Sequence, residues 1–124
     1  MPNRKVDKEL QTFEVFETNL REEISVTTDF DLPLSVLVAR IEAGWSEEAT
    51  RSALDALRVA DLITATAPDE ISIALPNTST EDAQVVERRL RAVVPEARVG
   101  ITQHHAGDAA PDLLERARAS AERV

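Results

Sequence analysis

The most constraining feature of the sequence is an almost wholly apolar run over residues 34–41, which reads Leu-Ser-Val-Leu-Val-Ala-Arg-Ile. A run this short suits a strand better than a buried helix, and its lack of alternation is typical of a strand that is buried on both faces. Pro33 directly precedes the run and disfavours helix just before it. The chain is therefore expected to form a sheet with residues 34–41 in its interior.

Three further segments have strand character. Residues 71–75 alternate between apolar and small or polar side chains with a period of two. Residues 62–66 form a second β-rich run, and the turn-like sequence over residues 67–70 separates the two. This pair is predicted to be an antiparallel hairpin. Residues 97–102 are predicted to be a fourth strand.

Helical periodicity fills the intervals between the predicted strands. A helix is predicted over residues 5–28, because apolar side chains recur there at steps of three and four: Val6, Leu10, Phe13, Phe16, Leu20 and Ile24. Further helices are predicted from Ser46 to about residue 59, over residues 80–93, and from near Pro111 onward. Four strands with helices between them indicate an α+β sandwich, with a four-stranded, mainly antiparallel sheet and flanking helices.

Composition excludes several classes of function. The 124 residues suffice for one domain, and the absence of cysteine excludes a disulfide scaffold, a thiolate metal site and a cysteine nucleophile. The net charge of −9 argues against nucleic acid as a partner, because phosphate contacts need positive surface. No apolar run approaches the ~20 residues of a membrane span, and the N-terminus shows no apolar signal segment. We therefore expect a cytoplasmic protein that does not bind a membrane.

Several segments resemble, in the same order, the motifs of one family of bacterial signalling domains. They are Pro33-Leu-Ser-Val-Leu-Val-Ala-Arg-Ile-Glu42 for a first strand P-L-S-L-L-L-L-D-I-D, Arg58-Val-Ala-Asp61 for R-x-x-D, Ala67-Pro-Asp-Glu-Ile71 for G-G-[DE]-E-F, Leu75-Pro-Asn-Thr78 with Glu87-Arg-Arg-Leu-Arg91 for L-P-x-T and AERLR, Arg98-Val-Gly-Ile101 for S-I-G-V, and Asp112-Leu-Leu-Glu-Arg-Ala-Arg-Ala119 for the closing helix. The chain thus resembles a GGDEF domain, the diguanylate cyclase fold. The resemblance implies a nucleotide-cyclase or ferredoxin-like sandwich over residues 13–124, preceded by an N-terminal helical extension over residues 1–12.

The same comparison shows departures at the catalytic positions of the family. In the signature segment Ala67, Pro68, Asp69, Glu70 and Ile71, the first two residues replace glycines that let the backbone approach the nucleotide. Arg40 stands where the family has an aspartate ligand of Mg²⁺, although Glu42 keeps the next acidic position. The helix after residue 46 is shorter and lacks the family's guanine-contacting residues. We therefore expect no enzyme activity, no metal and no cofactor, and we expect Arg40 to pair with a carboxylate such as Glu42 or Asp69.

The resemblance also implies a possible ligand site away from the signature. In the family, the R-x-x-D motif binds cyclic di-GMP with help from an arginine on the helix after the hairpin. Arg58, Asp61 and Arg89 occupy these positions. A guanidinium suits a phosphate or a guanine edge, and a carboxylate accepts from guanine N–H groups. The other interpretation is that Arg58 and Asp61 form only a local i,i+3 ion pair.

Two functions follow from these expectations. The first is a catalytically inactive GGDEF-like signalling domain that acts as a cyclic di-GMP receptor through Arg58, Asp61 and Arg89. The alternative is a protein–protein interaction module without nucleotide binding, which forms a homodimer or binds a partner through its N-terminal helix.

Overall fold

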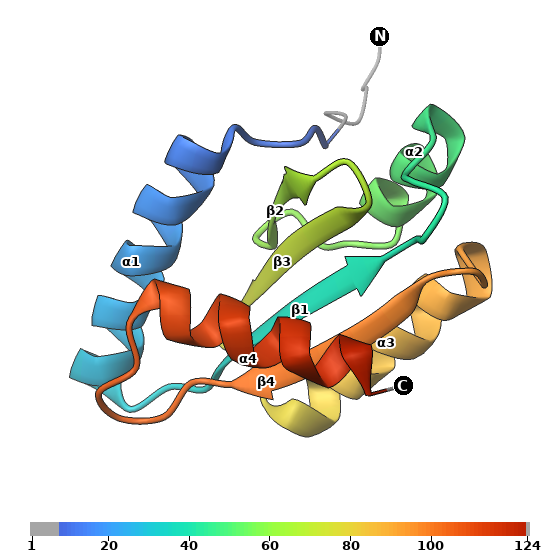
Figure 1. Cartoon of the computed structure of the whole chain (residues 1–124). Coiled ribbons are helices and arrows are strands. Elements are labelled where there is room, and N and C mark those ends of the chain that lie inside the picture. Colours follow the sequence, from blue (N-terminus) through green and yellow to red (C-terminus); the bar gives the residue numbers. More distant parts are fainter. Residues whose placement is uncertain (1–7, 124) are drawn as a thin grey trace, which may run out of the picture.

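The computed structural model describes residues 8–123, and its centre is a four-stranded antiparallel sheet. The strands are β1 (Leu34–Arg40), β2 (Leu62–Ala67), β3 (Glu70–Pro76) and β4 (Arg98–Gln103), and they lie in the order β2-β3-β1-β4 (Figure 1). All three pairs of neighbouring strands are antiparallel. The predicted interior strand and the predicted hairpin are both confirmed.

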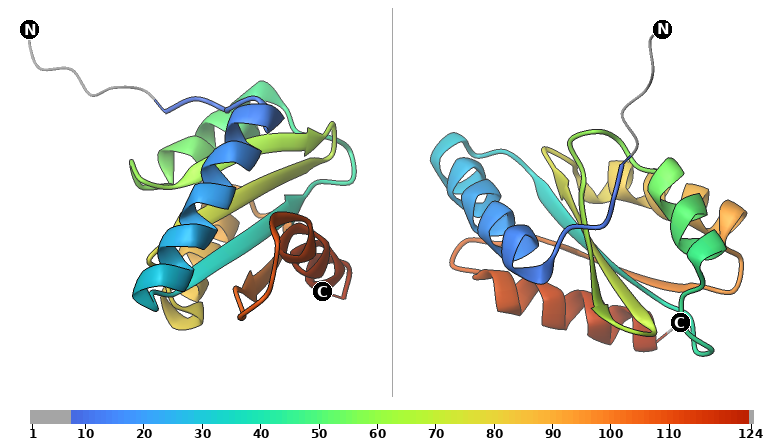
Figure 2. Two further views of the ribbon diagram at one scale, coloured as in Figure 1. Left: turned by 90° about the vertical axis from the view of Figure 1, so that its left-hand side faces the viewer. Right: turned by 90° about the horizontal axis from the view of Figure 1, so that it is seen from above.

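Four helices cover the two faces of this sheet. They are α1 (Phe13–Phe30), α2 (Glu47–Asp55), α3 (Thr80–Val93) and α4 (Ala110–Glu122). In Figure 2, α1 and α4 lie on one face and α2 and α3 on the other. Within residues 8–123, no helix combines the length and the apolar character that crossing a bilayer would require.

The central strand β1 contributes to a separate core on each face. Val36 and Val38 pack with Phe16 and Leu20 of α1 and with α4. Leu37 and Ala39 point the other way, into the core beneath α2 and α3. This alternation follows from the strand geometry, which turns successive side chains to opposite faces. Because both faces are covered, the strand can be apolar at almost every position.

The helix predicted over residues 5–28 is wrong in its first part. The helix begins at Phe13, after Thr12 accepts a hydrogen bond from Val15 N at 3.2 Å as its N-cap, and residues 8–12 are not helical. The physical reason is that Gln11 N–H donates to Ile63 O at 2.9 Å, so this segment bonds to the edge strand β2 instead of continuing the helix. Val6 lies outside the described residues.

The helix predicted from Ser46 to about residue 59 is correct in its N-cap but too long. Ser46 accepts a hydrogen bond from Ala49 N at 3.0 Å, and the helix ends at Asp55. Beyond it, the carboxylate of Asp61 accepts from the backbone N–H of Arg58 at 2.8 Å, and the chain turns there. Arg58 and Asp61 therefore lie in a turn after the helix rather than on a helix face.

Gly100 provides a test of how closely α4 packs on the sheet. A Cβ atom at this position of β4 would lie 2.2 Å from both Ala117 O and Ala121 N, which are backbone atoms of α4. Gly100→Ala should therefore push the helix outward and lower the free energy of unfolding by ~1–3 kcal/mol or more, as overpacked cores do. Urea denaturation measures this change.

The control is Val59→Ala, because the Val59 side chain is 98% exposed. This variant should change the free energy of unfolding by less than about 0.5 kcal/mol. A Gly100→Ala protein as stable as the parent would contradict the close packing of α4 on β4.

Candidate functional site

The turn between β2 and β3 is held against the segment that follows β1. Ile41 N–H donates to Asp69 O at 3.0 Å, and Trp45 N–H donates to Pro68 O at 3.1 Å. The indole Nε1 of Trp45 also donates to Ala39 O at 3.2 Å, and its ring packs against the core. Backbone bonds therefore fix the signature segment, residues 67–71, close to the end of β1.

Arg40 bridges this turn to the end of α4. Its Nη2 lies 3.2 Å from Asp69 Oδ2, and its Nη1 lies 3.0 Å from Glu122 Oε2. The hydrogen bond to Asp69 is the main reason that the pKa of Arg40 is raised above its usual value. The expected pairing with Asp69 is confirmed, whereas Glu42 is exposed and the structure places Glu122 at the second position instead.

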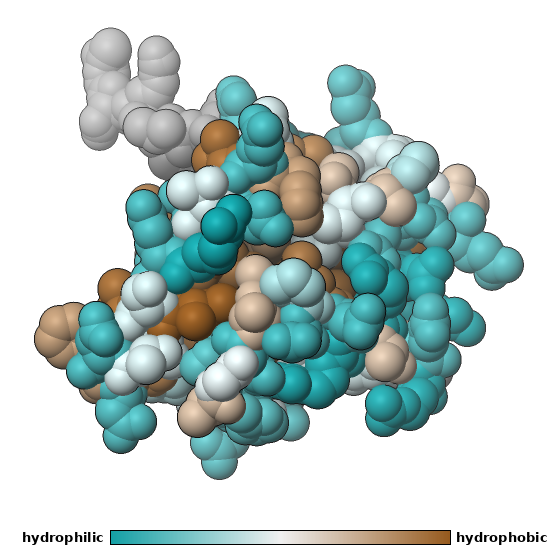
Figure 3. All heavy atoms as spheres, turned by 60° about the vertical axis from the view of Figure 1, so that its left-hand side comes forward, coloured by the Kyte–Doolittle hydropathy of each residue, from teal (hydrophilic) through white to brown (hydrophobic). Residues whose placement is uncertain are grey.

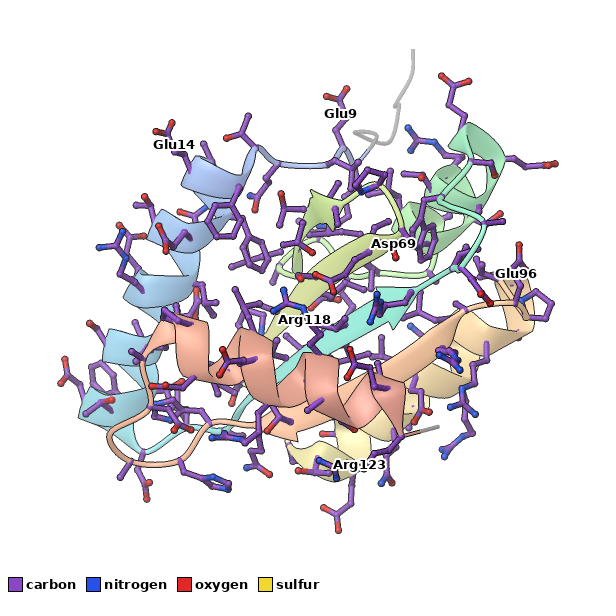
Figure 4. All side chains as sticks on the ribbon, in the orientation of Figure 1. Glu9, Glu14, Asp69, Glu96, Arg118 and Arg123 are labelled. Atoms are coloured by element: carbon purple, nitrogen blue, oxygen red, sulfur yellow. The ribbon has the colours of Figure 1, made fainter. Side chains whose placement is uncertain are left out.

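Glu70 has its own arginine. Its carboxylate is 4% exposed and accepts from Arg118 Nε at 2.8 Å and from Arg118 Nη2 at 2.9 Å, while the Thr66 hydroxyl donates to it at 2.5 Å. Figure 4 shows Arg118 extending from α4 toward the hairpin. The bonds from Arg118, aided by Thr66, lower the pKa of Glu70 although its burial acts in the opposite direction.

Arg118 was not among the residues that the sequence analysis singled out. A usable signal existed, because Leu114 precedes it by one helical turn and belongs to the apolar stripe of the last helix. Arg118 therefore lies close to the face that packs on the sheet. A partly covered arginine at such a position requires a carboxylate opposite it.

These pairs determine what the hairpin can do chemically. Both acidic side chains of the turn, Asp69 and Glu70, are bound by guanidinium groups of the same chain. Ile71, the last residue of the signature segment, is 1% exposed and belongs to the core. Within residues 8–123, no three histidine or acidic side chains are grouped so that they could hold a metal ion.

The second candidate site is the turn that contains Arg58 and Asp61. The Arg58 guanidinium lies 2.9 Å from Asp61 Oδ1 and also donates to Thr78 Oγ1 at 2.7 Å. The Asp61 side chain is fully buried, while that of Arg58 is 49% exposed. The predicted i,i+3 ion pair is therefore present, and Asp61 faces Arg58 rather than solvent.

Arg89 reaches the same place from α3. Its Nη1 donates to Ala56 O at 3.2 Å, two residues before Arg58. Arg89 therefore contacts the chain two residues before Arg58. The ligand site formed by Arg58, Asp61 and Arg89 stays a prediction. Among the described residues, neither Arg58 Nη1 nor Arg89 Nη2 has a hydrogen-bond acceptor. Both guanidinium groups could therefore still donate to a phosphate or a base oxygen.

The two adjacent histidines lie in the loop between β4 and α4. The backbone N–H of His104 donates to Leu34 O at 2.8 Å, and that of His105 donates to Asp108 Oδ2 at 2.8 Å. Arg116 binds the same carboxylate at 2.7 Å and is the main reason that the pKa of Asp108 is lowered to about 2. These contacts fix the loop to α4.

Comparison with known proteins gives two different results. No family model matches the sequence, and no curated protein matches it. Solved structures do match the fold. The diguanylate cyclase SiaD from Pseudomonas aeruginosa, solved with its activator SiaC, aligns with a TM-score of 0.83 and 22% identity over 92% of this chain. The chain spans only about half of SiaD, 54% of its length.

Two isolated domains match over nearly their whole length. The active GGEEF domain of a diguanylate cyclase from Vibrio cholerae has a TM-score of 0.81 and 15% identity, with coverage of 93% of this chain and 90% of that one. The GGDEF domain of DgcB from Caulobacter crescentus, solved with cyclic di-GMP, has a TM-score of 0.80 and 11% identity, with coverage of 99% and 92%. The strand order, the two helical layers and these likenesses lead to one conclusion: the chain has the fold of a GGDEF domain.

Proposed function

We propose that this chain is a catalytically inactive signalling domain of the GGDEF fold, and that it binds cyclic di-GMP through Arg58 and Arg89. Asp61 is a positioning residue in this proposal, because it holds the Arg58 guanidinium from behind. The neighbour DgcB was solved with cyclic di-GMP, which supports the choice of ligand.

One observation carries the proposed loss of catalysis. The hairpin carboxylates Asp69 and Glu70 are each paired with an internal arginine, Arg40 and Arg118. A Mg²⁺ ion needs oxygen ligands and would have to compete with these guanidinium groups for them. Arg40 also adds a positive charge next to the place where the family binds its metal. Ala67 and Pro68 further remove the two glycines, and Pro68 cannot donate a backbone hydrogen bond to a phosphate.

The support for ligand binding is the exposed half of the Arg58 site. Asp61 and Thr78 fix the guanidinium without covering it, and Arg89 of α3 binds the carbonyl of Ala56, two residues before Arg58. Preorganised arginines bind phosphate or the oxygen and nitrogen acceptors of guanine with little loss of side-chain entropy. Because Asp61 is already satisfied by Arg58, the ligand would contact the arginines rather than the carboxylate.

One prediction of the proposed function concerns turnover of GTP. Incubation of the protein with GTP and Mg²⁺ or Mn²⁺ should yield no cyclic di-GMP, because the hairpin offers no unpaired carboxylate for the metal. Chromatography of the reaction mixture measures the product, and an active diguanylate cyclase under the same conditions serves as the positive control. Product that disappears in an Asp69→Ala variant would overturn the proposed inactivity.

Another prediction of the proposed function concerns the binding of cyclic di-GMP. Calorimetric titration with cyclic di-GMP should give a measurable affinity, and Arg58→Ala should weaken it roughly ten- to a hundredfold, since charge-assisted hydrogen bonds contribute ~1.5–3 kcal/mol. Arg89→Ala should weaken binding less, because Arg89 supplements the site. Asp61→Asn should also weaken binding, since it removes the charge that orients Arg58.

The matched control is Arg91→Ala. Arg91 lies on the same helix as Arg89 but pairs with Glu87 at 2.8 Å, so its loss should leave the affinity unchanged. Tight binding that survives Arg58→Ala would place the ligand elsewhere. If the parent protein shows no binding at high micromolar ligand, the receptor function is wrong.

A second candidate function is a protein-interaction module, and the exposed apolar side chains of α1 favour it. Phe13, Val15 and Phe30 are 44%, 48% and 70% exposed. Figure 3 shows hydrophobic side chains among hydrophilic ones on the side of the molecule that carries α1. A homodimer or a partner protein would cover them. SiaD, whose domain has the same fold, was solved with an activator protein.

A further inference from the structure

The segment over residues 8–12, here called the strap, connects two parts of the domain that are far apart in sequence. Gln11 N–H donates to Ile63 O at 2.9 Å, and the Thr64 hydroxyl donates to Gln11 O at 2.8 Å. These bonds add a short parallel bridge to the outer edge of β2. Figure 2 shows the strap running along this edge between α1 and α2.

The other end of the strap touches the turn that contains Arg58 and Asp61. The Lys8 ammonium donates to Val59 O at 3.1 Å, and Arg51 of α2 donates to Lys8 O at 3.1 Å. Partial burial lowers the pKa of Lys8, while the charge of Asp61 acts in the opposite direction, so the ammonium lies within the field of that carboxylate. Val59 directly follows Arg58. Its side chain is 98% exposed and therefore does not pack in the core.

One turn is therefore held from two sides. On the inner side, Asp61 binds both the backbone N–H and the guanidinium of Arg58. On the outer side, the Lys8 ammonium binds the next carbonyl, that of Val59. Arg58 and Val59 are adjacent in the chain, so the backbone that carries Arg58 leads directly into the carbonyl that Lys8 binds. The strap continues directly into α1, which begins at Phe13.

We propose that the strap and the Arg58–Asp61 turn are energetically coupled, so that an anionic ligand at Arg58 tightens the docking of the strap on β2. This inference rests on the proposed function for the identity of the ligand, cyclic di-GMP. The coupling is reciprocal: the protein with an undocked strap binds the ligand more weakly by the same factor by which the ligand favours docking of the strap. Binding at the turn is thereby transmitted to the start of α1.

The strap has the properties of a segment whose docking can change when a ligand binds at the turn. Two hydrogen bonds hold it to β2 and two hold it to α2 and the turn that follows, apart from those of Thr12 to α1, and Leu10 within it is 38% exposed. Segments with few buried apolar contacts open at low free-energy cost, so a modest change at the turn alters their docked population. The amide of Gln11 reports this population directly, because its hydrogen bond to Ile63 exists only in the docked strap.

The experiment measures hydrogen exchange of the Gln11 amide by NMR, with and without cyclic di-GMP. In the parent protein, the ligand should slow this exchange about fivefold, the effect of roughly one additional net hydrogen bond. Thr64→Val removes the hydroxyl bonded to Gln11 O without changing charge, so it should speed the exchange. It should weaken the ligand in proportion to the undocked fraction of the strap, and at most by the coupling factor of about five. Thr28→Val is the matched control, because its hydroxyl binds Ile24 O within α1. It should change neither quantity.

A second arm needs no ligand. Arg58→Ala removes the guanidinium that fixes the turn and should accelerate Gln11 exchange in the free protein. If cyclic di-GMP binds but leaves Gln11 exchange unchanged, the coupling is wrong while the receptor function stands. If cyclic di-GMP does not bind, the receptor function fails, and the coupling is judged by Arg58→Ala alone. Unchanged exchange in that variant would overturn it.

Discussion

The rest of the structure depends on burying β1 on both faces. Residues 34–39 are at most 1% exposed, and β3 and β4 satisfy the backbone of the strand on either side. Each large aliphatic side chain buried in this way contributes ~1.5–3 kcal/mol. Ser35, the one hydroxyl within this run, donates to Thr78 O at 2.8 Å and so avoids an unsatisfied buried group. The run ends at Arg40, and the first candidate site begins where the strand leaves the core.

The elements that the sequence predicts well are those whose signals are local. The apolar run of β1, the period of two in β3 and the helical pattern of α3 over residues 80–93 depend only on neighbouring residues, and all three appear where they were expected. The start of α1 depends instead on a contact between Gln11 and Ile63, about fifty residues away. The periodic Val6 and Leu10 suggested a longer helix, and Thr12, a good N-cap residue, was the signal that could have corrected the boundary.

In the candidate sites, too, the contacts that the sequence predicts are those with local signals. The Arg40–Asp69 pair could be predicted because a partly buried guanidinium requires a carboxylate and the hairpin places one nearby. Arg118 and Glu122 could not be assigned as partners, since both lie on α4, 48 and 82 residues away from the side chains that they bind. The Arg58–Asp61 pair was expected from its spacing, but the full burial of Asp61 depends on how the chain turns after α2.

The two arginine sites differ in what a ligand would have to displace. At the hairpin, a cation could reach Glu70 only by separating it from Arg118, which would leave a guanidinium without its counter-charge beside a buried carboxylate. Breaking such a pair costs more than the pair contributes, because the desolvation of the charges is not repaid. At the turn, the counter-charge Asp61 lies behind Arg58, and the exposed side of the guanidinium keeps Nη1 without an acceptor among the described residues. An anion can therefore add to Arg58 without removing Asp61. In both pairs the carboxylate is buried and the arginine is partly exposed. The same kind of ion pair therefore opposes the binding of a cation at the hairpin and allows the binding of an anion at the turn, and the sign of the ligand's charge makes the difference.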